Sequence, residues 1–118
     1  MSFEKINKGK NGELFVSEWL ENQGFKIIGR NVRHRIAEID IVALHPDETT
    51  ISFVEVRTRN ESIHGHPLET VNHRKQMHIR KAAELFLMKN RISGVAIQFD
   101  VASIVWQTQE FIYLKNAF

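Results

Sequence analysis

The chain of 118 residues contains no cysteine, only two prolines and no long run of apolar residues. Without cysteine, it can form neither disulfide bonds nor thiolate sites for metal ions. No apolar stretch approaches the roughly 18 residues that a membrane-spanning helix needs. The first residues, Met1 to Lys5, also lack the apolar core of a secretory signal. We therefore expect one domain covering residues 1–118, located in the cytoplasm and not in a membrane.

Net charge is also small, formally +2 at pH 7, which is too mild to identify a nucleic-acid partner by itself. The basic residues are unevenly distributed, however. One cluster comprises Arg30, Arg33, His34 and Arg35, and residues 57–81 hold six Lys or Arg against two Glu. This distribution is typical either of a solvated basic face or of a surface that follows phosphate groups.

Hydrophobic periodicity divides the chain into helices and strands. We predict helices over residues 12–23 and 70–90, and strands over residues 25–32, 37–45, 50–58, 95–105 and 110–114. A polar, glycine-containing loop is expected over residues 60–67. The first three strands should form an antiparallel meander, and the long helix should return the chain to a parallel fourth strand. The predicted architecture is an α/β (α+β) fold in which helices flank a mixed central sheet of roughly four to five strands.

The hairpin formed by the second and third predicted strands contains one unfavourable pairing. If its loop is centred on residues 47 and 48, the facing pairs are Leu44–Ile51, Val42–Phe53, Ile41–Val54, Asp40–Glu55, Ile39–Val56 and Glu38–Arg57. The pair Asp40–Glu55 places two carboxylates on one face, with Cβ atoms about 5 Å apart. Its neighbours on that face are apolar, so desolvation increases the repulsion between the two acids.

Three arrangements would relieve this repulsion. The pair can share a proton, which raises one pKa, or Arg57 can pair with Glu55 from the same face. A hard cation can also bind, since Mg²⁺ accepts two carboxylates together with phosphate and water. The backbone carbonyl of Val56 is available as a further metal ligand. Spacing alone leaves both a metal site and a salt-bridged structural cluster open.

Short motifs are spread over most of the chain. They are Gly12-Glu13, Gly24-Phe25 with Asn31-Val32-Arg33, Ala37-Glu38-Ile39-Asp40, residues 53–59, residues 65–75 with Ile79, and Phe99-Asp100-Val101. Together they resemble the paired motifs GEID and FVEVK-x-R, and the accompanying motifs, of the YraN-like family of bacterial proteins. That family has no established function and is similar to the PD-(D/E)XK nucleases, which include archaeal Holliday junction resolvases. The resemblance implies a restriction-endonuclease-like αβββαβ core.

The resemblance also implies roles for individual residues. Asp40 and Glu55 would be ligands of Mg²⁺ or Mn²⁺. Glu13 would reach over from the first helix as a further ligand or as a group that orients water. Arg57 would occupy the position of the basic residue after the second acid, and Lys75 would lie near phosphate on the long helix. The implied activity is metal-dependent hydrolysis of phosphodiester bonds in DNA, with branched or otherwise structured DNA as the expected substrate.

Position 57 departs from the superfamily pattern, which has lysine there. Arginine stays charged and cannot act as a base, although it can stabilise charge on a phosphorane-like transition state. This departure leaves open a second function, a nucleic-acid-binding module that kept the fold without the chemistry. A third is a partner-binding protein whose acid pair is structural. By analogy with related nucleases that pair to cut two strands, the resemblance also implies a homodimer.

Overall fold

A computed structural model of the chain describes residues 11–60 and 71–118. The elements are α2 (Gly12–Asn22), β1 (Lys26–Arg33), β2 (Glu38–Leu44), β3 (Thr50–Arg59), α3 (His73–Lys89), β4 (Ala96–Val105) and β5 (Glu110–Leu114). This is the predicted order, and every boundary lies within three residues of the predicted one. The loop expected over residues 60–67 falls outside the described residues, except for residue 60.

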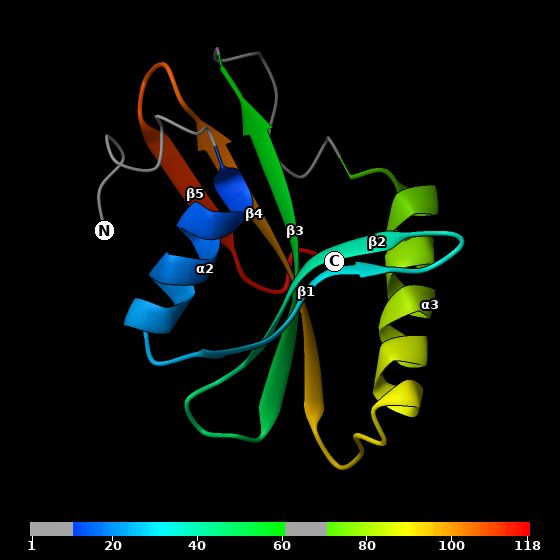
Figure 1. The fold of residues 1–118 in the computed structure, drawn as a ribbon. Helices are drawn as coiled ribbons and strands as arrows, with labels where there is room; N and C mark the ends of the chain where they lie inside the picture. The colour runs from blue at the N-terminus through cyan, green and yellow to red at the C-terminus, as the bar shows by residue number, and fades with distance from the viewer. Residues whose placement is uncertain (1–10, 61–70) are drawn as a thin grey trace.

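The strands form one five-stranded sheet in the order β1-β2-β3-β4-β5. Neighbouring strands are antiparallel except β3 and β4, which are parallel because α3 returns the chain to the starting edge of β3. The helices lie on opposite sides of the sheet, α2 on one face and α3 on the other (Figure 1). The predicted mixed α+β fold is confirmed, and it is consistent with a restriction-endonuclease-like core.

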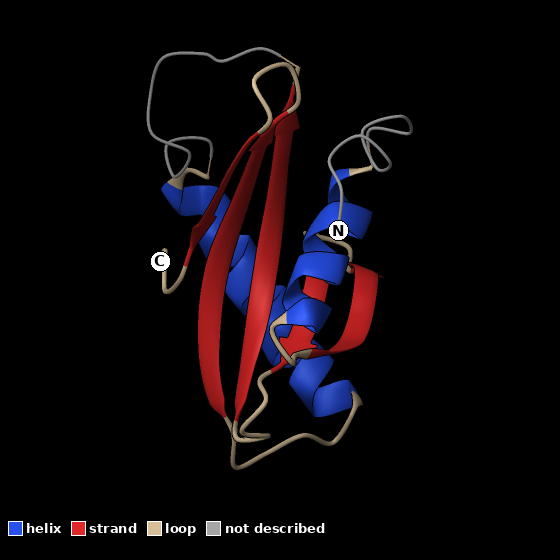
Figure 2. Ribbon diagram, turned by 90° about the vertical axis from the view of Figure 1, so that its left-hand side faces the viewer, coloured by secondary structure: helices blue, strands red, loops and turns tan. Residues whose placement is uncertain are grey.

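Each face of the sheet has its own hydrophobic core, and each core lies under one of the two helices that flank the sheet in Figure 2. Under α2 the buried residues are Phe15, Val16, Leu20, Ile41, Ala43, Val54, Ala102, Ile104 and Trp106. Under α3 they are Ile39, Val42, Ile51, Phe53, Val71, Ile79, Ala82, Ala83, Phe99 and Val101. No helix of the described residues is long and apolar enough to cross a membrane.

Helix α2 begins at Gly12, where Asn11 caps it by accepting a hydrogen bond from the backbone N–H of Leu14 at 3.0 Å. At this end the helix lies so close to β3 that a Cβ atom on Gly12 would collide with Cγ2 of Thr58. Glycine is therefore required by the close approach of helix and strand. This approach holds the next residue, Glu13, beside the sheet.

Helix α3 begins three residues later than the sequence predicts, at His73. The side chain of Asn72 accepts a hydrogen bond from the backbone N–H of Lys75 at 2.9 Å, and this cap fixes the start of the helix. Val71, expected on the apolar side of the helix, precedes it but is still buried in the core below α3. The capped first turn carries Lys75 towards β3.

Strand β2 pairs with β3 in the predicted register only over part of its length. The paired residues run from Leu44–Ile51 to Ile41–Val54. Beyond them, the backbone N–H of Val56 donates a hydrogen bond to Oδ2 of Asp40 at 2.7 Å. The strand therefore bends away from β3 at Asp40.

None of the three predicted pairs beyond Ile41–Val54 belongs to the β2–β3 ladder, although Asp40 and Glu55 still line one pocket. The other two pairs are wrong. Ile39 was expected opposite Val56 on the face that holds Ile41, but it lies opposite Val32 of β1 and packs in the core below α3. Glu38 was expected opposite Arg57, but it lies opposite Arg33 of β1 and forms an ion pair with it at 3.6 Å. Both differences arise because β2 stays paired with β1 after it has left β3.

A buried carboxylate joins the C-terminal strands on the α2 side. Asp100 of β4 accepts hydrogen bonds from the hydroxyl of Tyr113 at 2.6 Å, from Nε2 of Gln98 at 3.0 Å and from the backbone N–H of Asn116 at 3.0 Å. Burial, and then the nearby Asp100, raise the pKa of Tyr113, so its hydroxyl keeps the proton that it donates. Gln98 thus serves as a neutral donor to this acid.

Candidate active site

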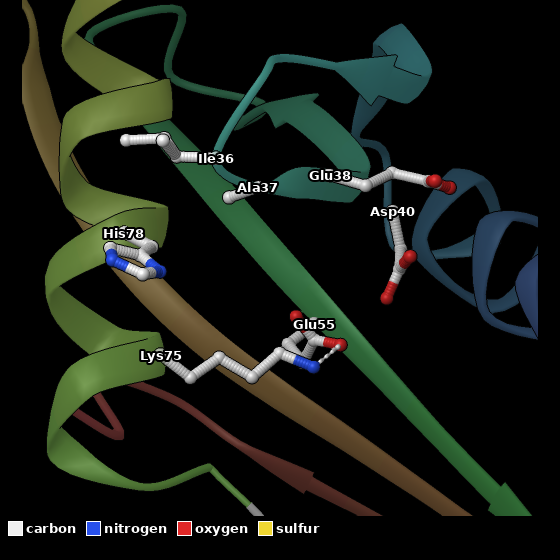
Figure 3. Close-up of a pocket in the computed structure, with 7 residues that line it drawn as sticks. All are labelled: Ile36, Ala37, Glu38, Asp40, Glu55, Lys75 and His78. Carbon is white, nitrogen blue, oxygen red and sulfur yellow. Dashed lines mark ion pairs between the residues drawn. The ribbon is translucent and has the colours of Figure 1, made fainter.

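A pocket of about 540 Å³ opens where β2 leaves β3. Its walls come from three parts of the fold, and the residues are Ile36, Ala37, Glu38, Asp40, Glu55, Lys75 and His78 (Figure 3). The first four belong to β2 and the turn before it, Glu55 belongs to β3, and the last two belong to α3. The bend in β2 is therefore what creates space beside Glu55.

Asp40 and Glu55 line the same pocket, close enough for the charge of Glu55 to act on Asp40. In Figure 3, the side chain of Asp40 points into the pocket towards Glu55. Burial, and then the neighbouring Glu55, raise the pKa of Asp40 to about 7, although the hydrogen bond from Val56 acts in the opposite direction. Near neutral pH the carboxyl group of Asp40 is therefore protonated for part of the time.

Two basic side chains flank Glu55, whose side chain is only 7% exposed. Oε1 of Glu55 lies 3.5 Å from Nζ of Lys75 and 3.8 Å from Nε of Arg57. The ion pair between Arg57 and Glu55, one of the three arrangements considered from the sequence, is therefore present. The raised pKa of Asp40 agrees with a second, in which one acid of the pair keeps a proton. Position 57 holds an arginine in place of lysine, but Lys75 of α3 places an ammonium group beside Glu55.

Glu13 reaches the same region from α2. One carboxylate oxygen from each of Glu13, Glu38 and Asp40 lies within 4.8 Å of the others. Burial, and then Asp40, raise the pKa of Glu13, while a hydrogen bond with the side chain of Asn31 lowers it. Figure 3 shows Glu38 pointing away from α3, towards α2. Asp40 therefore belongs to two groups of acids, one shared with Glu55 and one shared with Glu13 and Glu38.

These side chains fit a hard divalent cation. The donors are all carboxylate oxygens, which Mg²⁺ and Mn²⁺ prefer. Burial, and then a neighbouring acid, raise the pKa values of Asp40 and Glu13, and a bound cation would favour the charged form of both carboxyl groups. Val56 contributes its N–H, which binds Asp40, while the role of its carbonyl as a ligand stays a prediction.

Two ionisable residues of the pocket, Glu38 and His78, are not predicted as site residues from the sequence. Glu38 stands two positions before Asp40, so strand alternation alone places both on one side of β2, but the assumed pairing with Arg57 hides this. His78 lies one helical turn after Lys75 and therefore faces the same pocket. The spacing from Lys75 to His78 is the signal that could have identified it.

Residues 12–104 match the sequence profile of the uncharacterised protein family UPF0102. A UPF0102 protein of Persephonella marina is 42% identical over 111 residues, covering 94% of this chain and 92% of that protein. A UPF0102 protein of Prosthecochloris aestuarii is 41% identical over 116 residues, covering 98% of this chain and 90% of that protein. The matched range includes every residue of the pocket.

Proposed function

The chain belongs to the uncharacterised protein family UPF0102, the YraN-like family that its motifs resemble, and on this premise we propose that it is a metal-dependent nuclease acting on DNA. The observation that carries the proposal is the pair Asp40 and Glu55, two carboxyl groups crowded in one pocket beside Lys75. The pKa of Asp40, raised to about 7 by burial and by Glu55, is a feature that buried acids at functional sites often have.

Residues in the pocket and beside it would divide the reaction between them. Asp40 and Glu55 would hold Mg²⁺ or Mn²⁺, with Glu13 as a further ligand or as a group that orients water. When bound, the cation supplies positive charge that polarises the phosphodiester and acidifies the attacking water. Lys75 would donate hydrogen bonds to the scissile phosphate, and Arg57 would stabilise the negative charge that develops there. The oxygen of water bonds to phosphorus as the bond to the leaving strand breaks.

The ion pair of Arg57 with Glu55 at 3.8 Å supports a second candidate function. An arginine at this position cannot take a proton from water, and here its charge partly compensates the acid that would hold the metal. A protein with this arrangement can bind nucleic acid through its basic residues without cutting it. The second candidate is therefore a nucleic-acid-binding module with the same fold.

Cleavage assays separate the two candidates. Labelled single-stranded, duplex and branched DNA would be incubated with the wild-type chain and either Mg²⁺ or Mn²⁺. We expect cleavage of at least one of these substrates, and a loss of roughly 100-fold or more in Asp40→Asn, because the variant removes a carboxylate from the proposed metal site.

Glu84→Gln is the matched control, since Glu84 is an exposed acid on α3 whose recorded partner is Lys81, outside the pocket. The control should cut as fast as the wild type. DNA binding without cleavage of any substrate would contradict the nuclease and support the binding module. Equal cleavage by Asp40→Asn and Glu84→Gln would show that the activity does not come from this pocket.

A further inference from the structure

A second hollow lies on the same side of the sheet as the acidic pocket. It has a volume of about 400 Å³ and runs between β1 and the C-terminal half of α3. Its floor is apolar and is formed by residues such as Ile28, Val32 and Phe86. Its rim carries cationic side chains, namely Arg30 and Arg33 from β1 and Lys89 from α3, with His34 beside them. We call this hollow the basic groove.

The basic groove and the acidic pocket follow each other along one side of α3. Lys75 and His78 line the pocket, and Ala82, Leu85 and Lys89 line the groove. Steps of three or four residues place these side chains on one helical stripe. With a rise of about 1.5 Å per residue, Lys89 lies roughly 21 Å along the helix axis from Lys75. A strand stacked as in a duplex rises about 3.4 Å per nucleotide, so this length holds roughly six nucleotides at most, and fewer where the strand is extended.

The hairpin of β1 and β2 links the two hollows. Arg33 lines the groove, while Ile36 and Glu38, a few residues further along the hairpin, line the acidic pocket. In Figure 1 this hairpin reaches across to α3. Arg33 also pairs with Glu38 at 3.6 Å, so the last cation of the groove borders the first acid of the pocket. A bound polymer that lies along this row of α3 side chains would therefore pass directly from the basic groove into the acidic pocket.

The charge of the two hollows is opposite. The described residues that line the groove include no Asp or Glu, whereas the acidic pocket has three carboxyl groups. A row of cations without acids attracts phosphates along a backbone. The apolar floor sets a second requirement for the ligand, because contact with flat apolar groups such as bases would bury this floor from water. In single-stranded DNA the bases are free to make this contact, whereas in a duplex their faces are stacked inside.

We infer that the basic groove binds single-stranded DNA and leads it into the acidic pocket. This inference rests on the proposed function and names its substrate, a strand that extends several unpaired nucleotides to one side of the cut. Lys89 and Arg30 contact phosphates, and Leu85 with Phe86 supports the bases or sugars. Cleavage should then require an unpaired arm of that length, which a branched or frayed DNA provides and a blunt duplex lacks.

The test measures binding without metal, so that it does not depend on catalysis. A short fluorescein-labelled oligothymidylate is titrated with the full chain in EDTA, and anisotropy is followed at several salt concentrations. We expect Lys89→Glu to weaken binding roughly tenfold and to reduce the salt slope by about 1 or more. Leu85→Gln should weaken binding severalfold without changing the salt slope, because it alters the floor and not the charge.

Lys115→Glu is the matched control, because it changes the charge equally at an exposed position after β5, at the opposite edge of the sheet. Equal losses in Lys89→Glu and Lys115→Glu, no binding by the wild type, or tighter binding of a blunt duplex would each overturn the inference. If the groove variants lose binding while the wild type cuts no DNA, the proposal of a DNA-binding groove is supported and the proposal of a nuclease is contradicted. If the wild type cuts DNA and Lys89→Glu cuts and binds DNA like the control, the proposal of a nuclease is supported and the proposal of a DNA-binding groove is contradicted.

Discussion

Asp40 is held by two opposing influences. The N–H of Val56 donates a hydrogen bond to its carboxylate at 2.7 Å, which favours the charged form. Burial and the neighbouring Glu55 favour the neutral form and prevail, so the pKa is raised to about 7. The hydrogen bond from Val56 thus fixes the position of the Asp40 carboxylate, while burial and Glu55 disfavour its negative charge. A residue held in this way gains stability from a bound cation, and its protonation sets the pH at which the cation can bind.

Stability should therefore fall as pH rises through the range in which Asp40 ionises. In the folded chain its pKa is raised to about 7 from an ordinary value of 3.8, so the folded state binds more protons between about pH 4 and pH 7. The free energy of unfolding consequently decreases across that range. Asp40→Asn removes the charge, so its melting temperature should exceed that of the wild type by roughly 2–5 °C at about pH 8.

The same comparison near about pH 4, where Asp40 is protonated in the folded chain and partly so in the unfolded one, should show a much smaller difference. Asp47→Asn serves as control, because this acid lies in the β2–β3 turn and its pKa is lowered, chiefly by a hydrogen bond from the backbone of Thr49. The control should show no gain at high pH. A melting temperature of Asp40→Asn equal to that of the wild type at about pH 8 would refute the crowding of Asp40.

At the scale of elements, local sequence predicts most of the fold. The 3.6-residue and two-residue periodicities identify every helix and strand within residues 11–60 and 71–118, and the turn at Asp47 fixes the register next to it, from Leu44–Ile51 to Ile41–Val54. The bend at Asp40 is not predictable in the same way. The bend arises because β2 stays paired with β1 after it has separated from β3. The alternation of residues in β2 does not indicate which of its two neighbouring strands it will follow.

The candidate site is predicted to a similar extent. The motifs place Asp40 and Glu55 together, and the structure puts both in one pocket with Lys75. Glu38 and His78 are missed because their positions depend on the bend of β2 and on how α3 docks, which are both long-range features. Arg57 is found beside Glu55, as the two-residue spacing predicts, but the sequence gives no sign that Lys75 also reaches this acid.

Packing of α2 against β3 supports the site from a distance and can be tested at Gly12. At an exposed helical position, replacing glycine by alanine stabilises a protein by about 1 kcal/mol. Here the new Cβ would collide with Thr58 and lie 3.3 Å from Cγ1 of Val56, so we expect Gly12→Ala to destabilise the chain by about 1–3 kcal/mol. Urea denaturation measures this difference.

Asn22→Ala, at the exposed last residue of the same helix, is the reference and should change the free energy of unfolding by less than about 0.5 kcal/mol. An increase in the stability of Gly12→Ala would mean that α2 does not approach β3 as closely as described. Glu13 would then not be held in its position near Asp40.

At the scale of the whole molecule the two faces of the sheet differ, although Glu13 of α2 reaches the acids around Asp40. The α2 face holds a continuous core and the hydrogen-bonded Asp100, whereas the α3 face holds both the acidic pocket and the basic groove. A substrate that crosses this face would meet cations first and carboxylates second. Pairing of two copies, which the resemblance implies, stays a prediction, and a mass measurement in solution with and without branched DNA would test it.

Calorimetric titration of the metal-free chain with Mn²⁺ near neutral pH most directly tests whether the acids around Asp40 hold a divalent cation. We predict saturable binding by the wild type, release of protons on binding because Asp40 must ionise, and normal binding by Glu84→Gln. Binding should be weakened at least roughly tenfold in Asp40→Asn. No binding by the wild type at millimolar Mn²⁺, or equal binding by Asp40→Asn, would contradict the account.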